Sequence, residues 1–304
     1  MNKLEEARKS INEIDKEMAA LFVKRMEAAK LISEYKMERG LPILDQSREN
    51  EVIARNSKFV ADETLRSYYV NFLKETMGIS RKYQQMLQEG LKVAYSGVEG
   101  AFANIAAKNI FPSANQIPFG DFTSAYEAVV NGECDCAVLP IENSYAGEVS
   151  QVIDLMFQGS LYINGIYDLE VTHNLLGLPG ATINDIKTVI SHPQALEQCS
   201  KYIKKHGFEA VRANNTAIAA QNVVEAADKT VAAIASRDTA KLYGLNVLER
   251  RINESSMNTT RFAVFSRAES LPDYKETGRQ FIMVFTVRDE AGALAQAINI
   301  IGNC

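Results

Sequence analysis

The residues best suited to chemistry form a short polar cluster, 258–262 (Asn-Thr-Thr-Arg-Phe), which lies between two strand-like apolar runs at 245–248 and 262–265. An amide, two hydroxyls and a guanidinium destabilise a fold when they are buried without partners. A protein that carries them beside buried strands either satisfies them internally or presents them to a ligand. Both interpretations are open from these five residues alone.

A second candidate set consists of cations on a long helix. Residues 3–39 contain neither Gly nor Pro, and Gly40 stops the pattern. Apolar residues recur every three or four positions from Leu4 to Tyr35, which predicts that this helix packs lengthwise against another. Arg25 interrupts the apolar seam, where a guanidinium either meets an anion or serves as a polar residue that sets register.

Helix geometry groups the cations. At about 100° per residue, Lys36 faces within about 20° of Arg25, whereas Arg8 lies about 100° round the helix and faces a different neighbour. A shorter helix is expected to open at Asp45, which can cap it. A third helix, over residues 62–89, carries two polar residues one turn apart on one face, Ser80 and Gln84. These cations are expected to point into the helical unit, and the chain as a whole carries no excess of positive charge. Together the two observations predict a pocket for a small polyanion.

Residues 1–90 resemble the all-helical chorismate mutases. The motifs that match, in order and spacing, are Arg8, Arg25, Lys36, Asp45-x-x-Arg48-Glu49 and Ser80-x-x-x-Gln84. The resemblance implies an interlocked dimer and a pericyclic rearrangement of chorismate to prephenate that needs no nucleophile, proton transfer or cofactor. It further implies that arginines hold the carboxylates, with the first reaching the partner's site, while Lys36 and Gln84 donate to the ether oxygen. Asp45 and Glu49 would orient the ring hydroxyl, and Ser80 would contact substrate.

From residue 91 the pattern changes to short strands alternating with helices. Strands are expected at 91–95, 136–139, 188–191 and 231–235, each followed by a helix, and the helix after 136–139 is expected to begin near Glu148. Such elbows at the carboxyl ends of parallel strands present free N–H groups to anions, although any one of them is more often simple helix capping. The glycines after the first strand lack the third glycine and the Walker lysine, which excludes a nucleotide loop.

Residues 91–270 resemble the prephenate dehydratases. Four motifs match in order: Pro140-Ile-Glu142-Asn143-Ser144-x-x-Gly147-x-Val149, His173-x-Leu-Leu, Ser191-His192-Pro-Gln194-Ala and Asn258-x-Thr260-Arg261-Phe262. The resemblance implies two α/β lobes of periplasmic-binding-protein-like type, with a cleft for prephenate. The sequence departs from the family pattern at Ala103, where relatives usually carry a hydroxyl side chain. If that hydroxyl binds substrate in the relatives, a neighbouring residue would have to replace it here, or the affinity for substrate would drop.

The same resemblance assigns roles. Thr260 would donate a hydrogen bond or proton to the departing ring hydroxyl. The carboxylates would be gripped from opposite lobes by Asn143, Ser144, Ser191, His192 and Gln194. Glu142, Gly147, His173 and Asn258 complete the expected substrate-binding set. Arg261 would steady either the strand edge or a substrate carboxylate, and Phe262 would form either a wall of the ring pocket or part of the core.

The tail restarts an α/β pattern, with a strand expected at 281–287 and a helix from about residue 289 to the end. Residues 278–304 resemble the first strand and helix of an ACT-type regulatory domain. One strand and one helix cannot bury a core of their own. We therefore expect weak or absent inhibition by phenylalanine.

The overall composition and net charge limit the kinds of molecule that this protein is expected to bind. A net charge of −5 over 304 residues argues against a nucleic-acid or anionic-membrane surface. The amino terminus lacks a signal-peptide core, and cysteines and histidines match no zinc spacing, so a cytoplasmic, metal-free protein that acts as a homodimer or higher oligomer is expected. Two alternatives stay open: a non-catalytic two-lobed anion-binding protein with a helical dimerisation domain, or an enzyme that retains only one activity.

Overall fold

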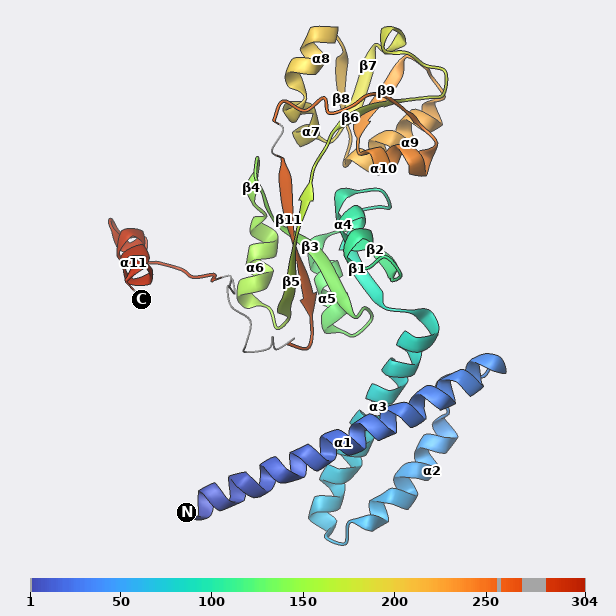
Figure 1. Cartoon of the computed structure of the whole chain (residues 1–304), viewed down its shortest axis with the longest axis vertical. Helices are drawn as coiled ribbons and strands as arrows, with labels where there is room; N and C mark the ends of the chain where they lie inside the picture. The colour runs from blue at the N-terminus through green and yellow to red at the C-terminus, as the bar shows by residue number, and fades with distance from the viewer. Residues whose placement is uncertain (1, 256–257, 270–282, 304) are drawn as a thin grey trace. The chain divides into compact units, whose positions relative to one another are not determined.

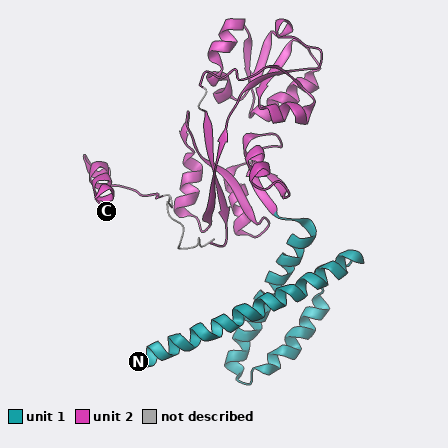
Figure 2. Ribbon diagram, in the orientation of Figure 1, with its two compact units in different colours: residues 1–91 teal, residues 92–304 magenta. Residues whose placement is uncertain are grey.

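The computed structural model describes residues 2–255, 258–269 and 283–303. The chain divides into two compact units, residues 1–91 and 92–304, which Figure 2 colours separately. The first unit is all-helical and the second is α/β, which confirms the fold class expected from the sequence.

Three helices build the first unit: α1 (Lys3–Glu38), α2 (Gln46–Asn56) and α3 (Glu63–Glu89), with a short 3₁₀ turn at Ser57–Phe59 (Figure 1). The Asp45 side chain accepts a hydrogen bond from the backbone N–H of Arg48 and so caps α2, as expected. α3 ends at Glu89, and Gly90 follows as its C-cap, with a φ of 79° that favours glycine. Local signals therefore set these helix boundaries.

Within this unit α3 covers only part of α1. The buried residues of α1 are Ala29 and Ser33, in its C-terminal half, and those of α3 are Met77, Ser80 and Gln84. The large apolar side chains of the expected seam are each at least 44% exposed along the whole helix: Leu4, Ile11, Ile14 and Met18 in the first half, and Leu21, Ile32 and Tyr35 in the second. Among the described residues α3 thus covers a face of the second half of α1 that holds Ala29 and Ser33, which are not seam positions, and the apolar stripe on the first half is uncovered.

The first lobe of the second unit is a mixed sheet of strand order β2-β1-β3-β11-β5, with β4 paired to β3. β1 is parallel to β2 and β3, whereas β11 is antiparallel to both of its neighbours. The strands are β1 (Lys92–Ser96), β2 (Asn115–Phe119), β3 (Cys136–Asn143), β4 (Gly147–Glu148), β5 (Tyr162–Glu170) and β11 (Thr259–Ser266), and the helices are α4 (Phe102–Ile110), α5 (Phe122–Val130) and α6 (Ser150–Gln158).

The second lobe holds a five-stranded sheet of order β10-β6-β9-β7-β8. Strands β7 and β9 match the sequence expectation, and each leads into a helix through a polar cap, His192 for α7 and Ser236 for α10. The strands are β6 (Asn174–Gly177), β7 (Thr188–Ser191), β8 (Glu209–Arg212), β9 (Val231–Ala235) and β10 (Asn246–Glu249), and the helices are α7 (Pro193–Gln198), α8 (Ser200–His206), α9 (Thr216–Ala226) and α10 (Arg237–Tyr243), with a 3₁₀ turn at Ile183–Asp185.

The chain passes between the two sheets twice. It leaves the first sheet after β5 (Tyr162–Glu170) through residues 171–173, and it returns from β10 (Asn246–Glu249) in the second sheet to β11 (Thr259–Ser266) in the first (Figure 1). The returning strand β11 inserts between β3 and β5. Residues far apart in the sequence therefore become neighbours: Thr260 pairs with Leu169, 91 positions earlier, on one side and with Asn143, 117 positions earlier, on the other.

Two expectations about this region are wrong. β3 does not end before Pro140; it continues to Asn143 and turns back as β4, while α6 begins at Ser150, close to the start expected near Glu148. The strand tolerates Pro140 because its register against β11 shifts there, and a bulge does not need the missing N–H. Similarly, Thr259–Phe262 lies inside β11 rather than between two strands.

The expected strand at 281–287 falls partly outside the described residues, and the part that is described, 283–287, has no strand. The following helix is present as α11 (Ala293–Gly302), with Gly292 at its N-cap. Cys134 and Cys136 are buried free thiols, and burial raises the pKa of Cys134 to about 11 and that of Cys136 to about 12. Among the described residues no helix is long and apolar enough to cross a membrane.

Candidate active sites

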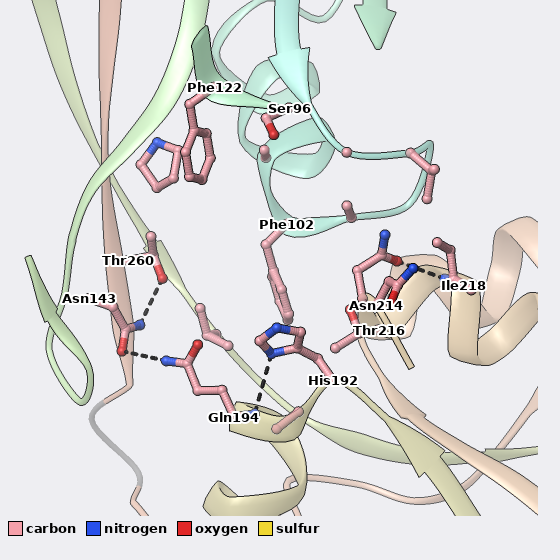
Figure 3. Close-up of a pocket in the computed structure, with 18 of the residues that line it drawn as sticks. Ser96, Phe102, Phe122, Asn143, His192, Gln194, Asn214, Thr216, Ile218 and Thr260 are labelled. Atoms are coloured by element: carbon pink, nitrogen blue, oxygen red, sulfur yellow. Dashed lines mark hydrogen bonds between the residues drawn. The ribbon is translucent and has the colours of Figure 1, made fainter. Parts of the chain in front are cut away.

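A cavity of about 700 Å³ opens in the second unit, with walls from both lobes (Figure 3). The first lobe contributes the β1–α4 loop and the ends of β3 and β11, and the second lobe contributes the starts of α7 and α9. Of the residues expected at a prephenate site, the ones that line this cavity are Asn143, His173, His192, Gln194, Asn258, Thr260 and Phe262. The cavity thus unites motifs from four separate parts of the sequence.

The Asn143 amide organises one wall. Its Nδ2 donates to Thr260 Oγ1 at 2.8 Å and to Asn258 Oδ1 at 2.9 Å. Its Oδ1 accepts hydrogen bonds from the backbone N–H groups of Tyr145 and Ala146, each at 3.0 Å. Because Thr260 Oγ1 already accepts from Asn143, its own hydroxyl hydrogen is left to point elsewhere. Figure 3 shows this pair facing the cavity.

The opposite wall carries the elbow after β7. His192 caps α7, since its Nδ1 accepts from the Gln194 backbone N–H at 3.3 Å, and burial lowers its pKa. The Gln194 side chain reaches across the cavity toward Asn143, with Nε2 at 3.5 Å from Oδ1. Ser191 is fully buried and donates to the Ile234 carbonyl at 2.6 Å, outside the lining. The elbow therefore presents His192 and Gln194 to the cavity and keeps Ser191 in the core.

His173 sits in the crossover between the sheets and is 3% exposed. Its Nε2 lies 2.7 Å from Gln198 Oε1, and the same oxygen accepts from Asn258 Nδ2 at 2.8 Å. Burial lowers the pKa of His173. A polar chain thus connects the crossover, α7 and β11.

Several expected binding residues lie outside the cavity lining. Arg261 points to the other face of β11, where it is half-exposed and pairs with Glu142 and Asp168, both at 3.1 Å. Ser144 Oγ accepts from the Thr259 backbone N–H at 3.0 Å, and Gly147 pairs with Asn143 in the β3–β4 hairpin. Of the two roles open for Arg261, the contacts in the structure match a brace between strands.

Some lining residues were missed by sequence reasoning. Asn215 caps α9 by accepting the Ile218 N–H at 2.8 Å, and both its neighbours, Asn214 and Thr216, line the cavity. The run Asn-Asn-Thr before an apolar segment is a helix-start signal that could have revealed them. The cavity is also lined by Ser96 and by the Gly-containing loop after it, and by Ala101–Ala103 at the start of α4, which has no side-chain cap. Gln198 gave no sequence signal.

The helical unit gathers its own polar cluster. Arg25 is partly buried, which lowers its pKa, and its guanidinium donates to Ser80 Oγ and, at 3.2 Å, to the Thr76 carbonyl. Gln84 is buried, and its Oε1 has no hydrogen-bond partner among the described residues. An unpaired buried amide oxygen next to a partly buried cation is typical of a site that a polar ligand completes.

The other expected mutase residues are arranged differently. Lys36 Nζ donates to the Ile43 carbonyl. Arg48 is exposed and pairs with Glu51 at 2.7 Å, whereas Glu49 pairs with Arg81. Arg8 is exposed on the first half of α1, about 25 Å along the helix from Arg25. Within one chain, therefore, Arg8 does not join the cluster around Arg25.

Comparison with known proteins identifies both units. The chorismate mutase type II model matches residues 7–85, and the prephenate dehydratase model matches residues 93–270. A bifunctional chorismate mutase/prephenate dehydratase of Buchnera aphidicola is 30% identical over 99% of this chain and 82% of its own length. The chain belongs to this bifunctional family. The resemblance drawn from the motifs is thereby confirmed, and so are the two activities of phenylalanine biosynthesis that the domains carry.

Other relatives are named as dehydratases. Arogenate dehydratase/prephenate dehydratase 2 of Arabidopsis thaliana is 34% identical over 86% of this chain and 69% of its own length. The chain spans about half, 53%, of a second Arabidopsis relative, arogenate dehydratase/prephenate dehydratase 1, at 37% identity. The prephenate dehydratase of Arthrobacter aurescens, solved with L-Phe, superposes with a TM-score of 0.61 at 28% identity, over 70% of this chain and 72% of that one. Family members thus share the two-lobed fold.

The burial of His173 predicts a pH dependence of stability. Because its pKa is lowered on folding, the unfolded chain binds more protons than the folded one between the folded pKa and about 6.5. The free energy of unfolding should therefore fall as pH drops below about 6.5, by at most about 1.4 kcal/mol per pH unit for this group. Urea unfolding of the second unit at a series of pH values measures it. His173→Gln should flatten the slope and His206→Gln, at an exposed site, should not; equal slopes in both variants would contradict the assignment.

Proposed function

We propose that the two clusters are the two active sites: the Arg25 cluster converts chorismate to prephenate, and the cavity around Thr260 converts prephenate to phenylpyruvate. The observation that carries the proposal is the Asn143–Thr260 hydrogen bond, which leaves the Thr260 hydroxyl free to donate into a cavity that is lined without Asp, Glu, Lys or Arg side chains. A small dianion fits a cavity of this size that is walled by amides, hydroxyls and a helix start without a side-chain cap.

For the mutase, the chain supplies charge and shape rather than a nucleophile. Arg25 would pair with a substrate carboxylate, and its contacts to Ser80 and Thr76 hold the guanidinium in place. The Gln84 amide would turn to donate to the ether oxygen as the C–O bond breaks and a C–C bond forms. Lys36 would assist once it exchanges its backbone carbonyl for the substrate. Arg48 would have to leave Glu51 to reach a carboxylate.

In the dehydratase reaction, electrons move from the ring carboxylate through the ring to the departing ring hydroxyl. The bond between the ring and its carboxylate breaks and releases carbon dioxide, the electron pair enters the ring, and the C–O bond to the ring hydroxyl breaks. The departing hydroxide needs a proton to leave as water. The Thr260 hydroxyl would supply a hydrogen bond or proton there, while His192, Gln194 and the first turn of α4 would hold the side-chain carboxylate.

We also propose that the protein is a dimer through its helical unit. Two observations support this: the uncovered apolar stripe on the first half of α1, and the distance that separates Arg8 from the Arg25 of its own chain. In a dimer the same stripe would be buried, and Arg8 would complete the site of the partner. We further propose three domains: a mutase domain over residues 1–90, a dehydratase domain over residues 91–270 and an incomplete ACT-like domain over residues 278–304.

Feeding the purified protein with chorismate tests the proposal. We expect prephenate to appear first and phenylpyruvate to follow, both resolved by chromatography. Prephenate alone would leave only the mutase, and conversion of added prephenate alone would leave only the dehydratase. If neither product formed in a folded sample, the chain would instead be a two-lobed anion-binding protein with a helical dimerisation domain.

Ala103 offers a gain-of-affinity test. It is 9% exposed and lines the cavity in the first turn of α4, so the serine hydroxyl in Ala103→Ser can reach the substrate without displacing the core. One added hydrogen bond is worth about 0.5–1.5 kcal/mol, which predicts a KM for prephenate about 2- to 10-fold lower. Steady-state kinetics with prephenate measures it, and the mutase activity of the same sample is the control. A raised KM would show that the hydroxyl cannot reach prephenate.

A further inference from the structure

We propose that Gln198 and His173 are positioning residues for the Thr260 hydroxyl, acting through a one-way chain of buried hydrogen bonds that crosses from the second lobe to the first. The inference rests on the proposed role of Thr260. The series of hydrogen bonds begins at His173 and passes through Gln198, Asn258 and Asn143 to Thr260. The first four of these side chains are each at most 9% exposed.

The direction in which hydrogens are donated along this series of hydrogen bonds is fixed at its first-lobe end, at Asn143. A backbone N–H can only donate, and two of them, from Tyr145 and Ala146, converge on one side of the Asn143 amide. The oxygen of Asn143 must therefore lie on that side. Its nitrogen must then face Asn258 and Thr260, so that Thr260 Oγ1 can only accept from it. The alternative amide orientation would set donors against both backbone N–H groups.

The remaining links follow from this anchor. Since Asn143 donates to Asn258, the oxygen of Asn258 faces Asn143 and its nitrogen donates to Gln198 Oε1 at 2.8 Å. Gln198 Oε1 is then an acceptor, and His173 Nε2, at 2.7 Å from it, must carry the proton. Since burial keeps this imidazole neutral, the proton on Nε2 leaves Nδ1 as a bare acceptor that carries no hydrogen, and Nδ1 has no partner among the described residues. Two donors on one oxygen hold the Gln198 amide in place.

The consequence for catalysis lies at the Thr260 end. When all of these hydrogen bonds are present, the Thr260 hydroxyl cannot donate to Asn143, and its hydrogen is available to the leaving group in the cavity. If Gln198 could not accept, the Asn258 nitrogen would lose its partner, and the Asn258 amide would be free to turn its own N–H group toward Asn143. Asn143 would keep its orientation, because the two backbone N–H groups hold its oxygen, but its nitrogen would lose the acceptor on Asn258 and would be displaced from Thr260 Oγ1. A residue of the second lobe thus helps to hold the Thr260 hydroxyl in position in the first.

Two substitutions at Gln198 test the acceptor. Gln198→Met has a similar volume but is a poor acceptor, and we expect kcat for prephenate to fall about 10- to 100-fold with KM changed at most about 3-fold. Gln198→Glu keeps an acceptor for both N–H donors, so kcat should stay within about 5-fold of the unmodified enzyme, although the added negative charge raises KM for the anionic substrate. The mutase activity of the same samples and circular dichroism confirm folding. Equal kcat losses in both variants, or a large KM effect alone in Gln198→Met, would overturn the proposal.

A double-mutant cycle separates positioning from a general structural role. If Gln198 acts through Thr260, then Gln198→Met should lower kcat by less than about 3-fold in a Thr260→Ala background, because the hydroxyl it positions is already gone. Losses that multiply would show that Gln198 acts independently, and the proposal would fail. A Thr260→Ala enzyme with undiminished activity would instead contradict the proposed function itself. The two failures are therefore distinguishable in one set of four proteins.

Discussion

Replacing Thr260 with alanine is expected to lower the dehydratase kcat by about 10²- to 10⁴-fold, the range that one positioned proton donor contributes. The substitution removes the hydroxyl that Asn143 orients toward the cavity. It should leave KM within a few-fold, because the carboxylate-binding groups stay in place. Folding should survive, because Asn143 Nδ2 keeps its bond to Asn258, and one lost hydrogen bond costs about 1 kcal/mol. Phenylpyruvate formation from added prephenate measures the effect.

The neighbouring residue provides a matched control. Thr259 lies on the same strand with the same side chain, but it alternates to the other face of β11 and does not line the cavity. Thr259→Ala should retain dehydratase activity within about 3-fold, and Thr260→Ser should retain more than Thr260→Ala because it keeps a hydroxyl. If Thr259→Ala and Thr260→Ala lost similar activity, strand disruption rather than the lost hydroxyl would explain both.

The second large effect is expected at Arg25. Arg25→Ala removes the partly buried cation that faces Ser80, and we expect mutase kcat/KM to fall by about 10²- to 10³-fold, as when a preorganised donor is removed from an active site. Conversion of added prephenate should be unchanged, because Arg25 belongs to the other unit. Chorismate consumption measures the loss.

Lys24→Ala is the control for this change, since Lys24 is an exposed cation one position earlier on α1. It should keep full mutase activity. Arg25→Lys should recover part of it, because the charge remains but the planar fork is lost. An Arg25→Ala enzyme that still rearranges chorismate at an undiminished rate would remove Arg25 from the site.

Much of the fold was predictable because its boundaries are set locally. Asp45 before an amphipathic run, Gly90 after one, and Pro193 in the first turn of α7 each fix a helix end through their own backbone and side-chain chemistry. Period-two alternation also carries information that could have been used further. With Thr260 and Phe262 toward the cavity, Arg261 has to face the other way, where it pairs with Glu142 and Asp168.

Other features depend on partners distant in sequence. The path of β3 through Pro140 is decided by its bulged pairing with β11, more than 110 residues later, and no local pattern announces it. Gln198 lies in a short helix, and its role depends on hydrogen bonds to residues 25 positions before and 60 positions after it. Arg8 could be assigned to a separate face, but the site it serves stays a proposal that needs a second copy of the chain.

The central claim is that one chain carries two separable active sites that act in sequence, and mixing two single-site variants tests it most directly. Neither Thr260→Ala nor Arg25→Ala alone should turn chorismate into phenylpyruvate at an appreciable rate. An equimolar mixture of the two should do so, because the first releases prephenate and the second consumes it. A folded mixture that accumulates prephenate without making phenylpyruvate, or that leaves chorismate untouched, would contradict the account.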